Sequence, residues 1–201
     1  ELGLRKYAIK QMYLSGRRTV IQERLDYQKQ YNDDGNLELL DDYVNDPLIN
    51  YVQSRLIDQD FLLAIQQKPS FQLNGKDKVH LHKLEKKFID TSETTIDFFN
   101  SENTFHLINQ RQTEINLVKQ STPESIQIAY GTKNIHITPE EILQKLGKEV
   151  EIINIKSSIY SNNQKLNNKN LSYEEQQAVR KSNALLFGHI SVLEGRENKF
   201  E

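Results

Sequence analysis

Two histidines in this chain are each followed, two residues later, by a hydroxyl side chain. The pairs are His136 with Thr138 and His189 with Ser191, and both lie among apolar residues. On a β-strand, residues i and i+2 lie on the same face, so each pair would present an imidazole beside a hydroxyl. An imidazole can act as a general acid or base, and a hydroxyl can bind a phosphate oxygen. The spacing therefore predicts candidate phosphate chemistry if both segments are strands.

The repeated His-x-Ser/Thr pattern resembles the paired motifs of the 2H phosphoesterases. The resemblance implies a phosphodiesterase that acts on RNA ends or cyclic phosphodiesters through His136 and His189, with Thr138 and Ser191 as hydroxyl partners. The match covers these two short motifs alone. Thr138 also suits a helix N-cap, and structural histidines, buried or on the surface, are the alternative interpretation. The phosphodiesterase is therefore kept as the alternative to a non-enzymatic function.

The other histidines do not predict a metal centre. His80 and His82 would point about 200° apart on a helix, so they could not share an ion there. The chain has no cysteine, which excludes thiolate catalysis, disulfides and cysteine-based metal sites. It also lacks the glycine-rich loop that cradles phosphates in nucleotide hydrolases. We expect neither a metal nor a cofactor.

Charge is distributed unevenly near the start of the chain. Arg17, Arg18 and Arg24 belong to a basic segment, and an acidic segment follows between residues 33 and 46. We predict that these arginines form a partner-binding surface; the alternative is that the two segments neutralise each other as solvated faces. The net charge of -2 gives no overall positive field, so nucleic acid is an unlikely partner.

The first part of the chain has the pattern of long helices. No glycine or proline occurs between Lys76 and Thr122, and apolar residues recur there at helical spacing. Helices are also predicted over about 4–31 and 47–67, the latter starting at Asp46-Pro47 because Asp suits an N-cap and Pro the first helical position. Residues 100–103 are expected to divide the long stretch into two helices, with one continuous helix as the alternative.

The second part of the chain shows a different periodicity. Apolar residues alternate over 126–130 and again at 135–137, a pattern that predicts a β-hairpin. Thr138 and Glu141 form a predicted capping box, and Gly147 is placed to end the helix that follows it. Strands are predicted over 150–155 and 187–193.

Between these two predicted strands we expect a polar loop over 157–171 and a further helix. Ser172 and Glu175 form the capping box that begins this helix, which should extend toward Leu186.

These patterns predict a mainly α fold with two domains. A helical bundle over 1–120 is expected to precede a small α+β module over 124–201. The chain begins at Glu1, so we expect a fragment of a larger bacterial or parasite protein. The longest apolar run, over 61–65, is too short for a transmembrane segment, so a soluble protein is expected, cytoplasmic or secreted without disulfides. The predicted function is a non-enzymatic protein-interaction domain that binds an unknown protein partner through a helical face.

Overall fold

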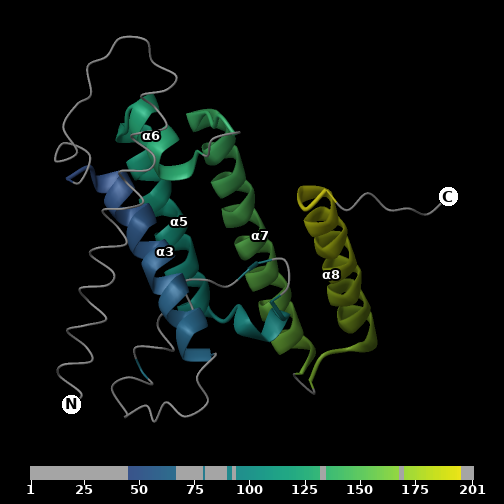
Figure 1. Cartoon of the computed structure of the whole chain (residues 1–201). Helices are drawn as coiled ribbons and strands as arrows, with labels where there is room; N and C mark the ends of the chain where they lie inside the picture. Colours follow the sequence, from purple (N-terminus) through teal and green to yellow (C-terminus); the bar gives the residue numbers. More distant parts are fainter. Residues whose placement is uncertain are drawn as a thin grey trace, which may run out of the picture. The chain divides into compact units, whose positions relative to one another are not determined.

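A computed structural model describes residues 45–66, 79, 90–91, 94–131, 135–167 and 170–195, with the side chains of 57 and 60–66 left out. Of this part of the chain, 82% is helical, in five α-helices and without a strand (Figure 1). The mainly α character is confirmed for these residues. The α+β module is wrong, because every segment in it that the sequence predicts as a strand is helical or irregular.

The chain divides into two compact units that interleave along the sequence. The first comprises residues 1–84 and 114–143, and the second comprises 85–113 and 144–201. The predicted bundle over 1–120 falls largely outside the described residues, so the division near residue 124 stays a prediction. The predicted helices over 4–31 and most of 76–99 also lie outside them.

Helix α3, Pro47–Gln66, begins as its sequence predicts. The Asp46 carboxylate accepts hydrogen bonds from the backbone N–H groups of Leu48 and Ile49 at 2.9 and 3.0 Å. These bonds satisfy donors that have no partner within the helix. The predicted N-cap is therefore confirmed.

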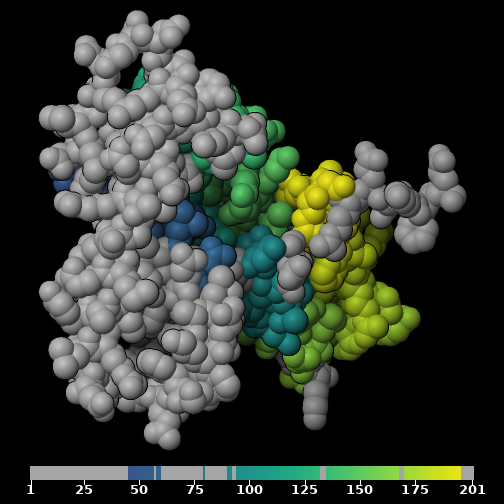
Figure 2. Space-filling model, viewed as in Figure 1, coloured from purple at the N-terminus to yellow at the C-terminus, as the bar shows by residue number. Residues whose placement is uncertain are grey.

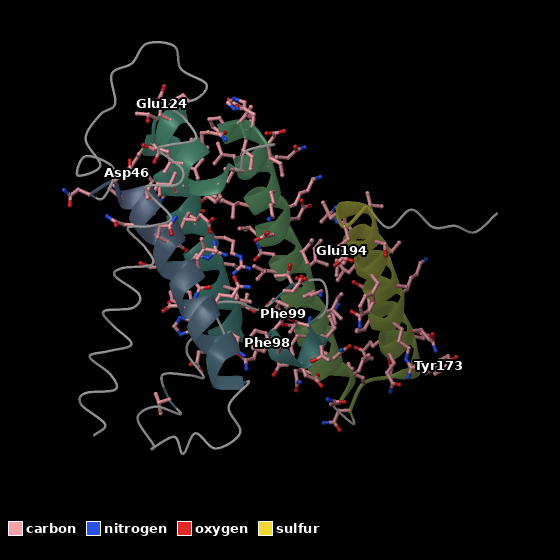
Figure 3. All side chains as sticks on the ribbon, viewed as in Figure 1. Asp46, Phe98, Phe99, Glu124, Tyr173 and Glu194 are labelled. Carbon is pink, nitrogen blue, oxygen red and sulfur yellow. The ribbon has the colours of Figure 1, made fainter. Side chains whose placement is uncertain are left out.

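Asp46 also joins two helices of the first unit. Its second carboxylate oxygen accepts a hydrogen bond from Ser125 Oγ at 2.7 Å, near the start of α6, Pro123–Tyr130. Thr122 caps α6 by accepting from the backbone N–H of Ser125. Figure 3 accordingly shows Asp46 and Glu124 at the same end of α3 and α6. One carboxylate thus fixes where the two helices start relative to each other.

The alternative of one continuous helix is wrong, because the chain breaks at Phe99 and Asn100, whereas residues 101–103 already belong to the next helix. A short 3-10 helix, η1 (Ile96–Phe98), precedes α5, Ser101–Gln120. The side chain of Asn100 accepts from the N–H of Asn103 at 2.9 Å, and the Asn103 amide donates to the carbonyl of Phe98 at 2.8 Å. These local bonds compete with helical bonds and separate α5 from the preceding turn.

Helix α7, Pro139–Leu166, is much longer than predicted. Its capping box is confirmed, because Thr138 N–H donates to Glu141 Oε2 and Glu141 N–H donates to Thr138 Oγ1. Gly147 does not end the helix, and the polar loop predicted over 157–171 is helical as far as Leu166. Glycine lowers helix stability only modestly, so the packing of the residues after Gly147 decides whether the helix continues.

Helix α8, Tyr173–Leu193, also continues past its predicted end. The capping box of Ser172 and Glu175 is confirmed. The strand predicted over 187–193 is wrong, since those residues complete the helix. Gly195 follows with a φ of 67°, in the left-handed region that favours glycine after a helix.

The predicted β-hairpin is wrong, because its first strand is helix α6, which has five consecutive buried residues. Its residues Ser125, Ile126, Gln127, Ile128 and Ala129 are all buried. Five consecutive buried residues cover more than one turn, so burial over this stretch does not follow the helical period. The alternation of isoleucines with Gln127 and Ala129 then imitates a strand.

The strand predicted over 150–155 is wrong for a related reason. Ile153 of α7 packs with Phe99 and Leu107, whereas Ile155 packs with Ile159 and with Ile190 of α8. One helix therefore contributes to two apolar clusters in the second unit. Because both faces are buried, apolar residues follow one another closely, as in a buried strand.

Two glycines give opposite predictions for an added methyl group. A Cβ on Gly131 would lie 1.9 Å from Gln127 Nε2 and 2.6 Å from the Gln127 carbonyl oxygen, so Gly131→Ala should destabilise the first unit. A Cβ on Gly147 meets nothing within 4 Å. Gly147→Ala should therefore stabilise α7 by about 0.4 to 1 kcal/mol. Thermal unfolding followed by circular dichroism measures both, and a neutral Gly131→Ala would contradict the close approach.

The Ser172–Glu175 capping box should make α8 sensitive to acid. The backbone N–H of Ser172, followed by its side chain, lowers the pKa of the Glu175 carboxyl below its ordinary value. A lowered folded-state pKa adds stability above the unfolded pKa of about 4.3, and this stability is lost as the pH falls through the folded-state pKa. The advantage of the wild type over Glu175→Gln in free energy of unfolding should therefore shrink from pH 6 toward acid.

Glu174→Gln is the control for this measurement. It removes the same charge from the same helical turn and leaves the capping box intact. Denaturant titrations at each pH give the free energies of unfolding. The role of the Glu175 carboxylate would be contradicted if the stability difference from the wild type shrank equally for both variants as the pH falls.

Candidate functional site

His136 lies in an extended segment that Gln127 holds against α6. The buried Gln127 amide donates to the carbonyl of Ile135 at 3.2 Å and accepts from the N–H of Ile137 at 3.1 Å. A side-chain amide thus pairs with the backbone as a neighbouring strand would. His136 itself is exposed.

The structure assigns Thr138 to a capping role. Its hydroxyl accepts from the N–H of Glu141 and donates to the Glu141 carboxylate at 3.2 Å. The backbone N–H of Thr138 and then its hydroxyl lower the pKa of Glu141, and His136 lowers it further. The hydroxyl is therefore engaged with the helix terminus, as the N-cap interpretation predicts.

His189 and Ser191 lie on α8 and not on a strand. Residues two apart on a helix point about 200° away from each other, so this pair does not present an imidazole beside a hydroxyl. His189 Nε2 lies 3.2 Å from Glu151 Oε1 of α7, in a half-exposed pair. Ser191 Oγ donates to the carbonyl of Phe187 within α8. The strand geometry required by the phosphoesterase motif is therefore absent at this position.

The remaining predicted sites cannot be placed. Arg17, Arg18 and Arg24, the predicted partner-binding residues, lie outside the described residues, as do His80 and His82. Among the residues that are described, no group of three or more His, Cys, Asp or Glu side chains could hold a metal ion. None of the helices in the described ranges is long and apolar enough to cross a membrane.

A buried carboxylate connects three helices of the first unit. Glu114 of α5 is 4% exposed and accepts hydrogen bonds from Arg55 of α3 and from the Tyr130 hydroxyl of α6, the latter at 2.7 Å. The Arg55 guanidinium also lies 5.9 Å from the ring centroid of Tyr51. Both carboxylate oxygens thus have donors, which offsets the cost of burying the charge.

Tyr130 is held in its protonated form. Burial, followed by the neighbouring Glu114 carboxylate, raises the pKa of the Tyr130 phenol well above its ordinary value. The hydroxyl therefore acts as a hydrogen-bond donor to Glu114 across the neutral pH range. This network explains the pairing of helices and presents no free nucleophile.

A buried lysine plays a comparable part in the second unit. Lys156 of α7 is 5% exposed, and its ammonium donates to the carbonyls of Thr91 and Thr94. It also lies 5.3 Å from the ring centroid of Phe99, within the range of a cation–π contact. Lys156 therefore ties the turn before η1 to α7.

Helix α8 carries an apolar row on its surface. Ala178, Leu185 and Val192 follow one another at seven-residue intervals, so they lie on one side of the helix. Leu185 is 70% exposed and Val192 is 75% exposed. Figure 2 shows side chains of α8 at the molecular surface. We call these three residues the outer stripe.

The outer stripe was not predicted, because residues 187–193 have the sequence pattern of a strand. The seven-residue spacing of Ala178, Leu185 and Val192 could have revealed it, given a helix of the correct length. No local signal singles out Glu114 or Lys156, because Arg55, Thr91 and Thr94 are distant in the sequence.

Comparison with known proteins finds no family model, no curated protein and no solved structure that matches the chain.

The Glu114 network predicts the behaviour of Tyr130→Phe. This variant leaves one buried carboxylate oxygen without its donor, so the free energy of unfolding should fall by about 1 to 2 kcal/mol. A group with a raised folded-state pKa contributes its full stability below its unfolded-state pKa, which is about 10 for tyrosine. This stability is lost as the pH rises above that value toward the folded-state pKa. The difference from the wild type should therefore shrink in alkali.

Urea titrations between pH 7 and alkaline pH test this prediction. Tyr173→Phe serves as the control, because Tyr173 is 75% exposed and its substitution should leave stability unchanged. An equal effect of the two substitutions would contradict the role of the buried hydroxyl.

Proposed function

We propose that this chain is a non-enzymatic protein-interaction domain that binds a protein partner through the outer stripe of α8. The observation that carries the proposal is the exposure of Leu185 and Val192 on a side of α8 that is separate from the side packed on α7. Isolated exposed apolar residues are ordinary on protein surfaces, whereas aligned ones are typical of contact surfaces.

The arrangement of α8 supports this proposal. Leu186, Ile190 and Leu193 lie in the apolar cluster with α7, so the inner side of α8 supplies its attachment. The outer stripe is not needed for that contact. The seven-residue spacing of the stripe runs along the axis of α8, as contacts between two packed helices do, so a helical segment of the partner fits it best.

Charged substitutions at the outer stripe should abolish partner binding without unfolding the chain. Because Leu185 and Val192 are largely exposed, Leu185→Glu combined with Val192→Glu should leave the melting temperature within a few degrees of the wild type. A photo-crosslinking amino acid at position 185 or 192, introduced in cells, should yield a discrete protein adduct that the double variant loses.

Gln177, exposed on the same helix, provides the matched position. A crosslinker there should give no such adduct. The proposal would be wrong if positions 185 and 192 gave no adduct, or if position 177 gave the same one.

A further inference from the structure

Three asparagine amides join α7 to α8 within the second unit. Asn162 Nδ2 donates to Asn183 Oδ1 at 2.8 Å, and Asn183 Nδ2 donates to Asn163 Oδ1 at 2.9 Å. The Asn183 amide therefore accepts a hydrogen bond from one residue of α7 and donates one to the next residue. All three side chains are partly buried.

These amides interrupt a seam that is otherwise apolar. On α8 the seam comprises Asn183, Leu186, Ile190 and Leu193, and Val179 continues the same alternating spacing of four and three residues. On α7 it includes Ile155 and Ile159. The two helices are antiparallel, since Asn183 meets residues 162 and 163 while Ile190 meets this isoleucine pair (Figure 1). This is the heptad arrangement of a two-helix coiled coil.

The connection between the helices does not by itself determine their register. Helix α7 ends at Leu166 and α8 begins at Tyr173, so residues 167–172 form the link. Six residues can span about 20 Å when extended. Packed helices lie about 8 to 10 Å apart, and a slip by one heptad moves a helix by about 10 Å along its axis. The link is long enough to accommodate such a slip.

The apolar seam residues do not determine the register either. Their spacing repeats every seven residues. A slip of α8 by one heptad in one direction therefore puts Leu193 where Leu186 lay, and a slip in the other direction puts Asn183 where Ile190 lay. One direction of slip places Ile190 against Asn162 and Asn163. The other places Asn183 among Ile155 and Ile159. Both leave partly buried amides without their partners, and such groups are costly to leave unsatisfied.

We infer that Asn183 is the residue that sets the register of α8 on α7, through its paired hydrogen bonds to Asn162 and Asn163. A polar residue at one seam position is known to specify register in coiled coils at some cost in stability. The same register decides where the outer stripe lies along α7.

The test uses the absence of cysteine from the chain. Spin labels on Gln164→Cys of α7 and Gly188→Cys of α8 report the axial position of one helix on the other. Both residues are exposed, and a Cβ on Gly188 meets nothing within 4 Å. Pulsed electron paramagnetic resonance on the labelled chain should give one narrow distance distribution. In Asn183→Leu, a second population should appear, displaced by about 10 Å along the helix axis.

Two further variants complete the design. Gln177→Leu adds the same side chain to an exposed position of α8 and should keep the single distance. The triple variant Asn162→Leu, Asn163→Leu, Asn183→Leu has a fully apolar seam, so α8 stays helical and attached even if Asn183→Leu alone loosens it. This variant should also show two populations.

A single unchanged distance in Asn183→Leu would overturn the inference. If α8 detaches in Asn183→Leu, the triple variant decides, and a single distance there would overturn the inference. Because the labels report helix positions in the isolated chain, the result does not depend on whether the outer stripe binds a partner.

Discussion

Burial of the Glu114 carboxylate is the constraint on which the first unit depends. A charge removed from water destabilises the fold unless donors replace the water, and here Arg55 and Tyr130 supply them from two other helices. Of the ways in which α3, α5 and α6 could pack, only those that bring both donors to Glu114 avoid that cost. An apolar contact tolerates small shifts, whereas this network requires one arrangement. The network therefore selects one packing among the three helices.

The same principle recurs at three other contacts between segments of the described residues. Asp46 accepts from its own helix and from Ser125, Gln127 binds the backbone on both sides of His136, and Asn183 bridges two residues of α7. Each side chain uses two hydrogen-bonding atoms at once. Apolar contacts supply most of the stabilisation, and these polar groups decide which helices pair and in which register.

The proposed function follows from the two sides of α8. In this helix, which is described in full, Ile190 is the only buried residue. Its attachment to α7 therefore rests on a narrow seam of apolar residues and the amides of Asn183. The outer stripe lies apart from that seam, so its apolar surface is free to contact another protein. The proposed function requires no catalytic group.

Local signals in the sequence determined where helices begin. Asp46 and the Ser172–Glu175 capping box are readable because each bonds the backbone within three residues, whatever the rest of the chain does. Periodicity failed in α6 and α7, because helices buried on more than one face lose the pattern that separates helix from strand. Nothing in the sequence distinguishes Glu114 from the other members of the 28 acidic residues, or Asn183 from other asparagines. Their roles were decided only by tertiary structure, since a buried polar group acquires its role from the distant partners that packing brings to it.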